Sequence, residues 1–157
     1  MLQTHADSRV LGYLGRALSF ELSAVQLYTT QARLLGIWGL VEESARLREE
    51  AREELTHAER IIARMLALSV APNASQLRPV KLGESLHDLL AYDVEFELEL
   101  VHLYNQAVEH CSRVGDQDNR VFFESLLNEE KAHARELTEW LSKIGQAGAS
   151  GGSANAS

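Results

Sequence analysis

The apolar residues of this chain recur every three or four positions along four long segments. These segments span about residues 7–35, 40–69, 84–111 and 119–144. Alternating steps of three and four place the apolar side chains on one face of a helix, and they are typical of helices packed in a bundle. The pattern therefore predicts an all-α chain with four bundle helices.

Short turns with glycine separate the segments within each half of the chain. Residues 36–39 (Gly-Ile-Trp-Gly) lie between the first two segments, and residues 115–118 (Gly-Asp-Gln-Asp) lie between the last two. Connections this short require the two helices of a pair to run antiparallel. The sequence therefore predicts two helical hairpins, one in each half.

A longer connection, residues 70–83, joins the two predicted hairpins and contains Pro72 and Pro79. A direct turn between neighbouring helices needs roughly 2–8 residues. Fully extended, this connection reaches roughly 45 Å, and a helix of about 28 residues is roughly 42 Å long. We therefore expect a crossover along the whole bundle. Because the chain becomes rich in Gly, Ser and Ala after residue 144, we expect a bundle domain over 1–144 and a flexible tail over 145–157.

Composition narrows the class of protein. The 157 residues suffice for one domain with a single core, and 45% of them are hydrophobic. The lone cysteine, Cys111, excludes an internal disulfide and a CxxC metal site. A net charge of −8 argues against nucleic-acid binding. The N-terminus lacks the features of a secretory signal and no run of about 18 apolar residues is present, so we expect a cytoplasmic protein without a membrane partner.

One glutamate interrupts the apolar face of each predicted helix, and the four glutamates belong to a repeated pattern. In each half a glutamate is followed 33 positions later by Glu-x-x-His, and every member of the first set recurs 76 positions later. The six residues are Glu21, Glu54, His57, Glu97, Glu130 and His133. In each half the midpoint between the two glutamates falls in or beside the turn, so both glutamates lie at one height in their hairpin.

Four carboxylates on apolar helix faces predict a metal site. Each buried carboxylate loses hydration worth several kcal/mol, and like charges repel one another. Two divalent cations balance four negative charges, and each Glu-x-x-His places two ligands on one helix face. Mixed carboxylate and imidazole donors suit iron or manganese, whereas structural zinc sites more often use thiolates. We therefore expect a carboxylate-bridged site for two metal ions.

The Glu-x-x-His spacing alone is weak evidence for a metal site. It also occurs as Glu84/His87 and as Glu99/His102. Neither pair has a counterpart 76 positions earlier, and Glu99 faces away from the predicted apolar face. We interpret both pairs as structural.

Two tyrosines share the helix faces of the glutamates. Tyr28 and Tyr104 follow Glu21 and Glu97 by seven residues. Either tyrosine could hydrogen-bond a ligating carboxylate or donate an electron during oxygen chemistry, which makes Tyr28 a candidate catalytic residue. The alternative is a core tyrosine whose hydroxyl is satisfied elsewhere.

Together these residues resemble the bacterioferritins, the haem-associated branch of the ferritins. The similarity runs without a gap from about Val10 to Ile144 and includes, beyond the six ligand positions, Tyr28, Trp38-Gly39-Leu40, Pro72-Asn73, Leu82-Gly83-Glu84 and Glu129-Glu130. The resemblance implies a ferritin-like four-helix bundle, a ferroxidase centre in each subunit, and a hollow shell of about 24 subunits built from twofold dimers. The implied roles are iron bridging by Glu54 and Glu130, one iron held by Glu21 and His57, and the other held by Glu97 and His133.

Three departures from the family pattern change what we expect. Leu55 stands where the family has the methionine that grips haem between two subunits, so a shell of this chain alone should lack family-type haem. Glu49 and Glu53 stand where the family's inner-surface iron site has a histidine and an aspartate. The Gly/Ser/Ala tail replaces the family's short fifth helix, which leaves a full shell and a smaller oligomer as alternatives.

The leading hypothesis is a bacterioferritin-like ferroxidase. It would bind two iron ions per subunit, or manganese, and oxidise Fe(II) to Fe(III) with O2 or H2O2 for iron storage and detoxification. The first alternative is a di-iron oxidoreductase that needs no cage, either a peroxide reductase or an oxidase of a small substrate. The second is a haem-free subunit that forms a hetero-oligomer with a haem-binding partner.

Overall fold

The computed structural model describes residues 6–73 and 75–153, with backbone alone for 147–153. Its helices are α1 (Ser8–Ile37), α2 (Val41–Ala67), α3 (Leu86–Val114) and α4 (Gln117–Ser153). The described residues contain no strand. The prediction of an all-α chain with four bundle helices is therefore confirmed.

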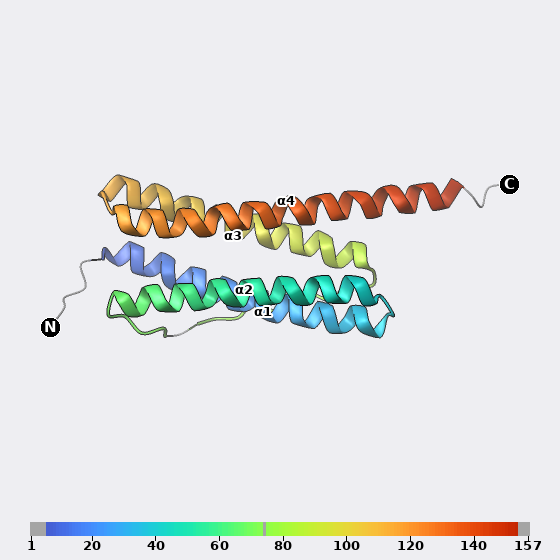
Figure 1. The fold of residues 1–157 in the computed structure, drawn as a ribbon, viewed down its shortest axis with the longest axis horizontal. Helices are drawn as coiled ribbons and strands as arrows, with labels where there is room; N and C mark the ends of the chain where they lie inside the picture. The colour runs from blue at the N-terminus through green and yellow to red at the C-terminus, as the bar shows by residue number, and fades with distance from the viewer. Residues whose placement is uncertain (1–5, 74, 154–157) are drawn as a thin grey trace.

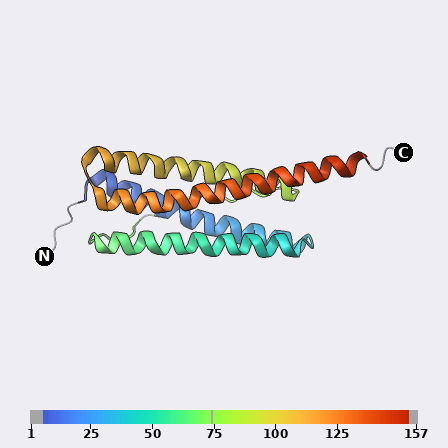
Figure 2. The ribbon, with the colours of Figure 1, turned by 45° about the horizontal axis from the view of Figure 1, so that its top comes forward.

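The four helices form two hairpins that lie side by side (Figure 1). Helix α1 packs along α2, α3 packs along α4, and α1 also contacts α3, whereas α2 and α4 touch far less. The connection from α2 to α3 runs from one end of the bundle to the other, beside α1 (Figures 1 and 2). The predicted crossover is therefore confirmed, and α2 and α3 run in the same direction.

Local sequence signals account for the helix ends. The Asp7 carboxylate accepts a hydrogen bond of 3.0 Å from the backbone N–H of Arg9, and the Ser85 hydroxyl accepts one of 3.1 Å from the backbone N–H of Asp88. Both contacts satisfy backbone groups that the first helical turn leaves free. Gly115 ends α3 with φ of 75°, a left-handed conformation that glycine adopts without a steric penalty. The predicted turn after residue 114 thus has a physical cause.

The apolar core has two parts, with the glutamates between them. One part includes Leu14, Ile61 and Phe123, and the other includes Leu35, Leu47, Leu89 and Leu137. Each helix contributes apolar side chains to both parts and one fully buried glutamate to the middle. The fold is therefore two apolar clusters that enclose one polar layer.

Helix α4 differs from expectation at its C-terminal end. It was expected to end at Ile144, but it continues to Ser153 and extends past the other helices (Figure 1). No proline lies in this stretch, and adding residues to an existing helix is far easier than starting a new one. Residues 145–153 are therefore helical in their backbone, and residues 154–157 lie outside the described residues. The bundle domain over 1–144 and the flexibility of the tail over 145–157 stay predictions.

None of the helices in the described part of the chain has both the length and the apolar character that crossing a membrane requires.

Ser23 fastens the crossover to α1, which gives a test of the fold. Its buried hydroxyl donates to the carbonyl of Ser19 (2.7 Å) and accepts from the backbone N–H of Arg78 (3.0 Å). Ser23→Ala should leave that N–H without its partner and destabilise the protein by about 1–2 kcal/mol. Thermal unfolding at fixed protein concentration measures the effect.

Thr30→Ala is the matched control, because the Thr30 hydroxyl donates to the carbonyl of Gln26 in its own helix (2.7 Å) and not to the crossover as far as it is described. We expect a change within about 0.5 kcal/mol. If both variants lost the same free energy of unfolding, the contact between Ser23 and the crossover would contribute nothing to stability.

Candidate metal centre

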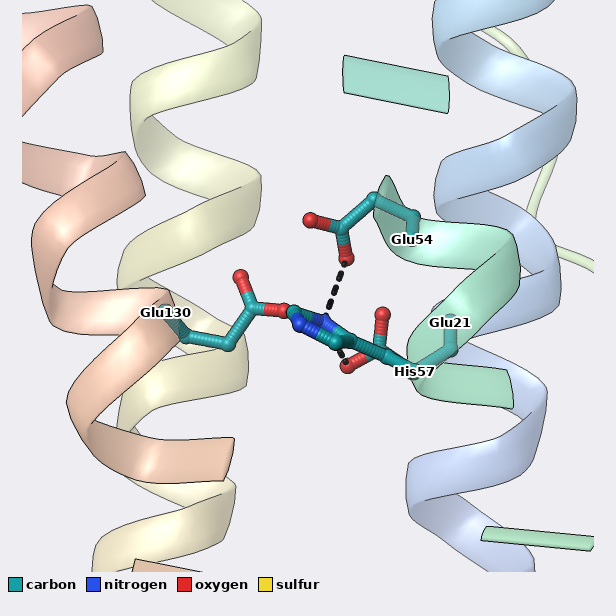
Figure 3. A group of neighbouring side chains, drawn as sticks. All are labelled: Glu21, Glu54, His57 and Glu130. Carbon is teal, nitrogen blue, oxygen red and sulfur yellow. Dashed lines mark hydrogen bonds and ion pairs between the residues drawn. The ribbon is translucent and has the colours of Figure 1, made fainter. Parts of the chain in front are cut away.

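Each helix places one glutamate at the same level of the bundle. Glu21 comes from α1, Glu54 from α2, Glu97 from α3 and Glu130 from α4, and none of the four is exposed to solvent. His57 and His133 stand one helical turn after Glu54 and Glu130 and are also buried. Figure 3 shows Glu21, Glu54 and His57 on one hairpin pointing towards Glu130 on the other. The structure therefore brings all six predicted residues together.

The six side chains form two donor sets that share two carboxylates. One set is Glu21, Glu54, His57 and Glu130, and the other is Glu54, Glu97, Glu130 and His133. Within each set one ligand atom per residue lies within 4.8 Å of all the others. Glu54 and Glu130 belong to both sets, so they lie where they could bridge two ions, and each of the other four residues belongs to one set.

Each histidine turns one nitrogen towards the carboxylates of the opposite hairpin. Nδ1 of His57 lies 2.6 Å from Oε1 of Glu130, and Nδ1 of His133 lies 2.8 Å from Oε1 of Glu54. The two rings stack, with centroids 5.9 Å apart. Both Nδ1 atoms thus face the interior, which leaves the Nε2 atoms on the outer side.

Both tyrosines donate hydrogen bonds to the glutamate of the opposite hairpin. The Tyr28 hydroxyl donates to Oε1 of Glu97 over 2.5 Å, and the Tyr104 hydroxyl donates to Oε1 of Glu21 over 2.7 Å. Both side chains are completely buried. Burial, together with the charge of Glu97, raises the pKa of Tyr28 well above its usual value, so its hydroxyl keeps its proton. Of the two interpretations of Tyr28, the contacts favour a residue that orients a ligand.

In the absence of metal ions, the buried glutamates and histidines of the centre bind protons. Burial raises the pKa of Glu54 and Glu97 well above the usual carboxyl value, and the neighbouring carboxylates raise it further. Burial lowers the pKa of His57 and His133, but hydrogen bonds and charges from the carboxylates outweigh it and bring both to about 10. At neutral pH the two imidazoles are therefore charged, and part of the carboxylate charge is neutralised by bound protons.

The residues fit two divalent cations. One oxygen of each glutamate, Oε2 of Glu21, Glu54, Glu97 and Glu130, is buried without a hydrogen-bond partner. Leaving such an oxygen unpaired costs about 1–3 kcal/mol, more for a charged group. Cations beside these oxygens would remove that cost and balance the four charges. Oxygen and imidazole donors without thiolate suit iron or manganese.

The two remaining Glu-x-x-His pairs lie away from this centre. Glu99 pairs with Arg78 at the surface, and His102, Glu84 and His87 are exposed. None of the four belongs to a donor set among the described residues. Their interpretation as structural agrees with these positions.

Sequence reasoning missed other buried polar residues. Glu50, Gln31 and Asp93 are buried, and each has side-chain atoms without a hydrogen-bond partner in the structure. Helical spacing carried a signal for two of them, because Glu50 and Asp93 precede Glu54 and Glu97 by four residues and share their helix faces. The polar layer is therefore wider than the six predicted ligands.

Comparisons with known proteins agree with the fold and with the centre. The family described as Ferritin-like domain matches residues 11–147. A bacterioferritin of Rhodobacter capsulatus is 37% identical over 145 residues, which cover 92% of this chain and 90% of that protein. A bacterial ferritin of Synechocystis is 31% identical over 140 residues, covering 88% and 90%.

A solved structure of Rhodobacter capsulatus bacterioferritin has a TM-score of 0.87 and 35% identity, and the match covers 92% of this chain and 89% of that one. That structure is described as having a metal-free dinuclear site and a haem iron in a crystallographic special position. The similarity thus extends over almost the whole bundle.

The protonated state of the metal-free layer predicts proton release on metal binding. Groups with a raised pKa hold their protons at pH 7, and a metal ligand must give up its proton. Binding of two Zn2+ ions should therefore release roughly four to five protons per chain: two from the imidazoles, one each from Glu54 and Glu97, and about half of one from Glu130, whose pKa is raised to about 7. A pH-stat titration of the weakly buffered metal-free protein measures this number.

His57→Ala removes one charged imidazole and should lower the proton count, whereas His102→Ala changes an exposed histidine and should leave it unchanged. Zinc binding without proton release would show that the layer is not protonated.

Proposed function

The chain belongs to the ferritin family, with bacterioferritins as its relatives, and we propose that it oxidises ferrous iron at the layer of buried glutamates. Bacterioferritins in general are iron-storage proteins with ferroxidase activity and a di-iron site. The observation that carries the proposal is the pair of donor sets joined by Glu54 and Glu130, each with buried carboxylate oxygens that lack a partner.

The proposed reaction takes one electron from each of two bound Fe(II) ions. Dioxygen accepts the two electrons with two protons and leaves as hydrogen peroxide, or peroxide accepts them with two protons and leaves as two waters. Holding both ions in one site lets the oxidant receive both electrons from a single position. Manganese would fit the same donors.

The side chains hold and orient the substrate ions. We assign Glu54 and Glu130 as bridges, Glu21 and His57 to one ion, and Glu97 and His133 to the other. Tyr28 and Tyr104 support this assignment, because their hydroxyls fix one oxygen of Glu97 and one of Glu21 and leave the second oxygen free. Burial of the whole layer keeps bulk water away from the oxidised ions.

We further propose that the chain stores and detoxifies iron in the cytoplasm, as part of a closed oligomer. The match to bacterioferritins over about nine-tenths of the chain supports a shell of about 24 subunits. Helix α4, which continues to Ser153 where the family has a separate fifth helix, favours the alternative of a smaller, cage-independent di-iron oxidoreductase. A mixed shell with a haem-binding subunit is the other alternative.

Stepwise addition of ferrous iron to the metal-free protein in air tests this function. We expect a fast rise in ferric absorbance for the first irons, about two per chain. If the protein stores iron, oxidation continues well beyond that number, the iron stays soluble, and light scattering gives a particle of about 24 chains. A fast phase that stops at about two irons, in a small oligomer, would favour the enzyme without a cage.

His57→Ala removes one proposed iron ligand and should slow the fast phase by more than about tenfold. The control is His102→Ala, which removes an exposed histidine of α3 and should leave the phase unchanged. Absence of a fast phase in the unaltered protein would refute the ferroxidase proposal.

Haem does not fit the residues that the family would use to bind it. Leu55 lies between Glu54 and His57 in sequence, is 43% exposed on α2, and has no atom that can ligate iron. Met65 is buried, and Met1 lies outside the described residues. We therefore propose that an oligomer of this chain alone binds no family-type haem.

Leu55→Met should introduce haem binding, because the substitution keeps the side-chain volume and adds a thioether at an exposed position. Haem titration followed by absorbance should give a bound-haem band for the variant and none for the parent protein. Exposed Leu98 on α3 provides the control, since Leu98→Met should add no band. Equal haem binding by the parent protein would contradict the proposal.

A further inference from the structure

Two buried polar side chains lie beside the dinuclear layer without belonging to it. Gln31 of α1 and Asp93 of α3 are completely buried. Both carboxyl oxygens of Asp93 and both the oxygen and the nitrogen of the Gln31 amide lack a hydrogen-bond partner among the described residues. Asp93 also belongs to none of the donor sets that the described residues form. Neither metal binding nor a hydrogen bond in this part of the chain therefore accounts for the Asp93 carboxyl group.

The position of the pair connects it to Tyr28 and Glu97. Gln31 follows Tyr28 by three residues on α1, and Asp93 precedes Glu97 by four residues on α3, so the members of each pair share a helix face. The Tyr28 hydroxyl donates to Oε1 of Glu97 over 2.5 Å. The charge that Asp93 carries when ionised raises the pKa of Tyr28, because the two side chains are close together. Tyr28 is therefore close to Asp93 and hydrogen-bonded to Glu97.

The internal repeat shows that packing does not require polar side chains at these two positions. The counterpart of Gln31 in the second half is Ala107, and the counterpart of Asp93 in the first half is Ala17. Both alanines are completely buried, so the bundle accepts apolar side chains at the equivalent level on its other side. The polar pair is thus particular to the half of the centre that contains Tyr28.

The surroundings of Asp93 favour a carboxylic acid over a carboxylate. Burial raises the pKa of Asp93 well above its usual value, and the charges of Glu97 on α3 and Glu50 on α2 raise it further, whereas the Gln31 amide on α1 lowers it. Cations bound by the layer would remove the repulsion from Glu97 but not the effect of burial, which is the largest cause. Asp93 should therefore keep its proton at neutral pH with and without metal ions.

We propose that Asp93 is a proton store for the oxidation of iron and supplies its proton to the Glu97 side of the layer through the Tyr28 hydroxyl. The proposal rests on the ferroxidase function proposed above. Tyr28 accepts the proton of Asp93 as it passes its own to Glu97, so its hydroxyl is neutral before and after the transfer. The Gln31 amide then donates a hydrogen bond to the Asp93 carboxylate, which stabilises the new charge.

The protons and electrons of this step balance. Two Fe(II) ions give one electron each to dioxygen, which also takes up two protons and leaves as hydrogen peroxide. Asp93 supplies one of the two protons and solvent supplies the other. Between turnovers solvent returns one proton to the Asp93 carboxylate. Asp93 acts through Tyr28 and does not bind iron, so its loss should change oxidation without changing metal binding.

Infrared spectroscopy of the protein loaded with two Zn2+ ions tests whether Asp93 holds a proton, and this test involves no oxidation. The C=O stretching band of a carboxylic acid is separate from the bands of carboxylates. The Zn2+-loaded protein should show such a band, and Asp93→Asn should lose intensity in it. Glu95→Gln is the matched control, because it removes an exposed carboxyl group of the same helix and should leave the band unchanged. Identical bands in the parent protein and Asp93→Asn would overturn the proposal.

Rapid mixing of the Fe(II)-loaded protein with dioxygen tests the transfer. Asp93→Asn keeps the size of the side chain but has no acidic proton, so the fast phase should slow by about tenfold or more. Because its protons must all come from solvent, the rate of this variant should rise more steeply with falling pH than the rate of the parent protein. Glu95→Gln should match the parent protein in rate and in pH profile. Calorimetry should show that Asp93→Asn still binds two Co2+ ions as tightly as the parent protein does.

The outcomes separate this proposal from the ferroxidase function. A fast phase of Asp93→Asn as rapid as that of the parent protein would overturn the proton store and leave the ferroxidase function intact. Weakened Co2+ binding by Asp93→Asn would also overturn it, because Asp93 would then act by holding the ligands in place. Absence of a fast phase in the unaltered protein would refute the ferroxidase function and the proton store with it. Circular dichroism checks that each variant keeps its helices.

Discussion

Mutual repulsion among four buried carboxylates is the constraint on which the rest of this structure depends. Glu21, Glu54, Glu97 and Glu130 come from four different helices and have no exposure to solvent, so their charge must be balanced inside the bundle. Protons balance part of it in the metal-free protein, as the raised pKa of Glu54 and of Glu97 indicates. The two apolar clusters on either side supply the packing that holds the layer closed. The apolar clusters at the two ends of the bundle thus stabilise the fold, and the glutamates that could bind metal lie between them.

The internal repeat explains why the centre is symmetric, and differences between the two halves show where this symmetry ends. Related residues from the two halves meet across the bundle, as in the contact of the Phe20 and Phe96 rings, whose centroids are 5.6 Å apart. The hydroxyl of each tyrosine likewise reaches the glutamate of the opposite half. Outside this inner layer the two halves differ. For example, the position equivalent to Arg60 in the second half is Glu136. The symmetric part would suit the binding of two equivalent ions, whereas the asymmetric part makes the surroundings of His133 more acidic than those of His57.

The sequence alone predicted the helices, the crossover and the meeting of six ligand residues, because all three depend on periodicity and repetition. It did not predict Glu50, since the repeat places Leu126 at the equivalent position and gives no second copy to notice. The end of α4 was also missed, because a run of Gly, Ser and Ala specifies neither a helix nor a stop once no proline interrupts it. The direction of each tyrosine hydroxyl depends on how the two hairpins pack, which no local pattern records.

The two sides of the bundle differ in the groups that they offer to a cation. On the side of α1 and α3, the Phe20 and Phe96 rings contact each other, and the guanidinium of Arg78 lies 4.0 Å from the centre of the Phe20 ring. The two rings offer no ligand atom to a divalent ion, and the charge of Arg78 is balanced by Glu99. On the side of α2 and α4, helix contacts are sparse, and the histidines are flanked by carboxylates. The carboxylates and imidazoles that could attract a cation therefore lie on this second side, whereas the crossover, which carries Arg78, packs against α1 on the first.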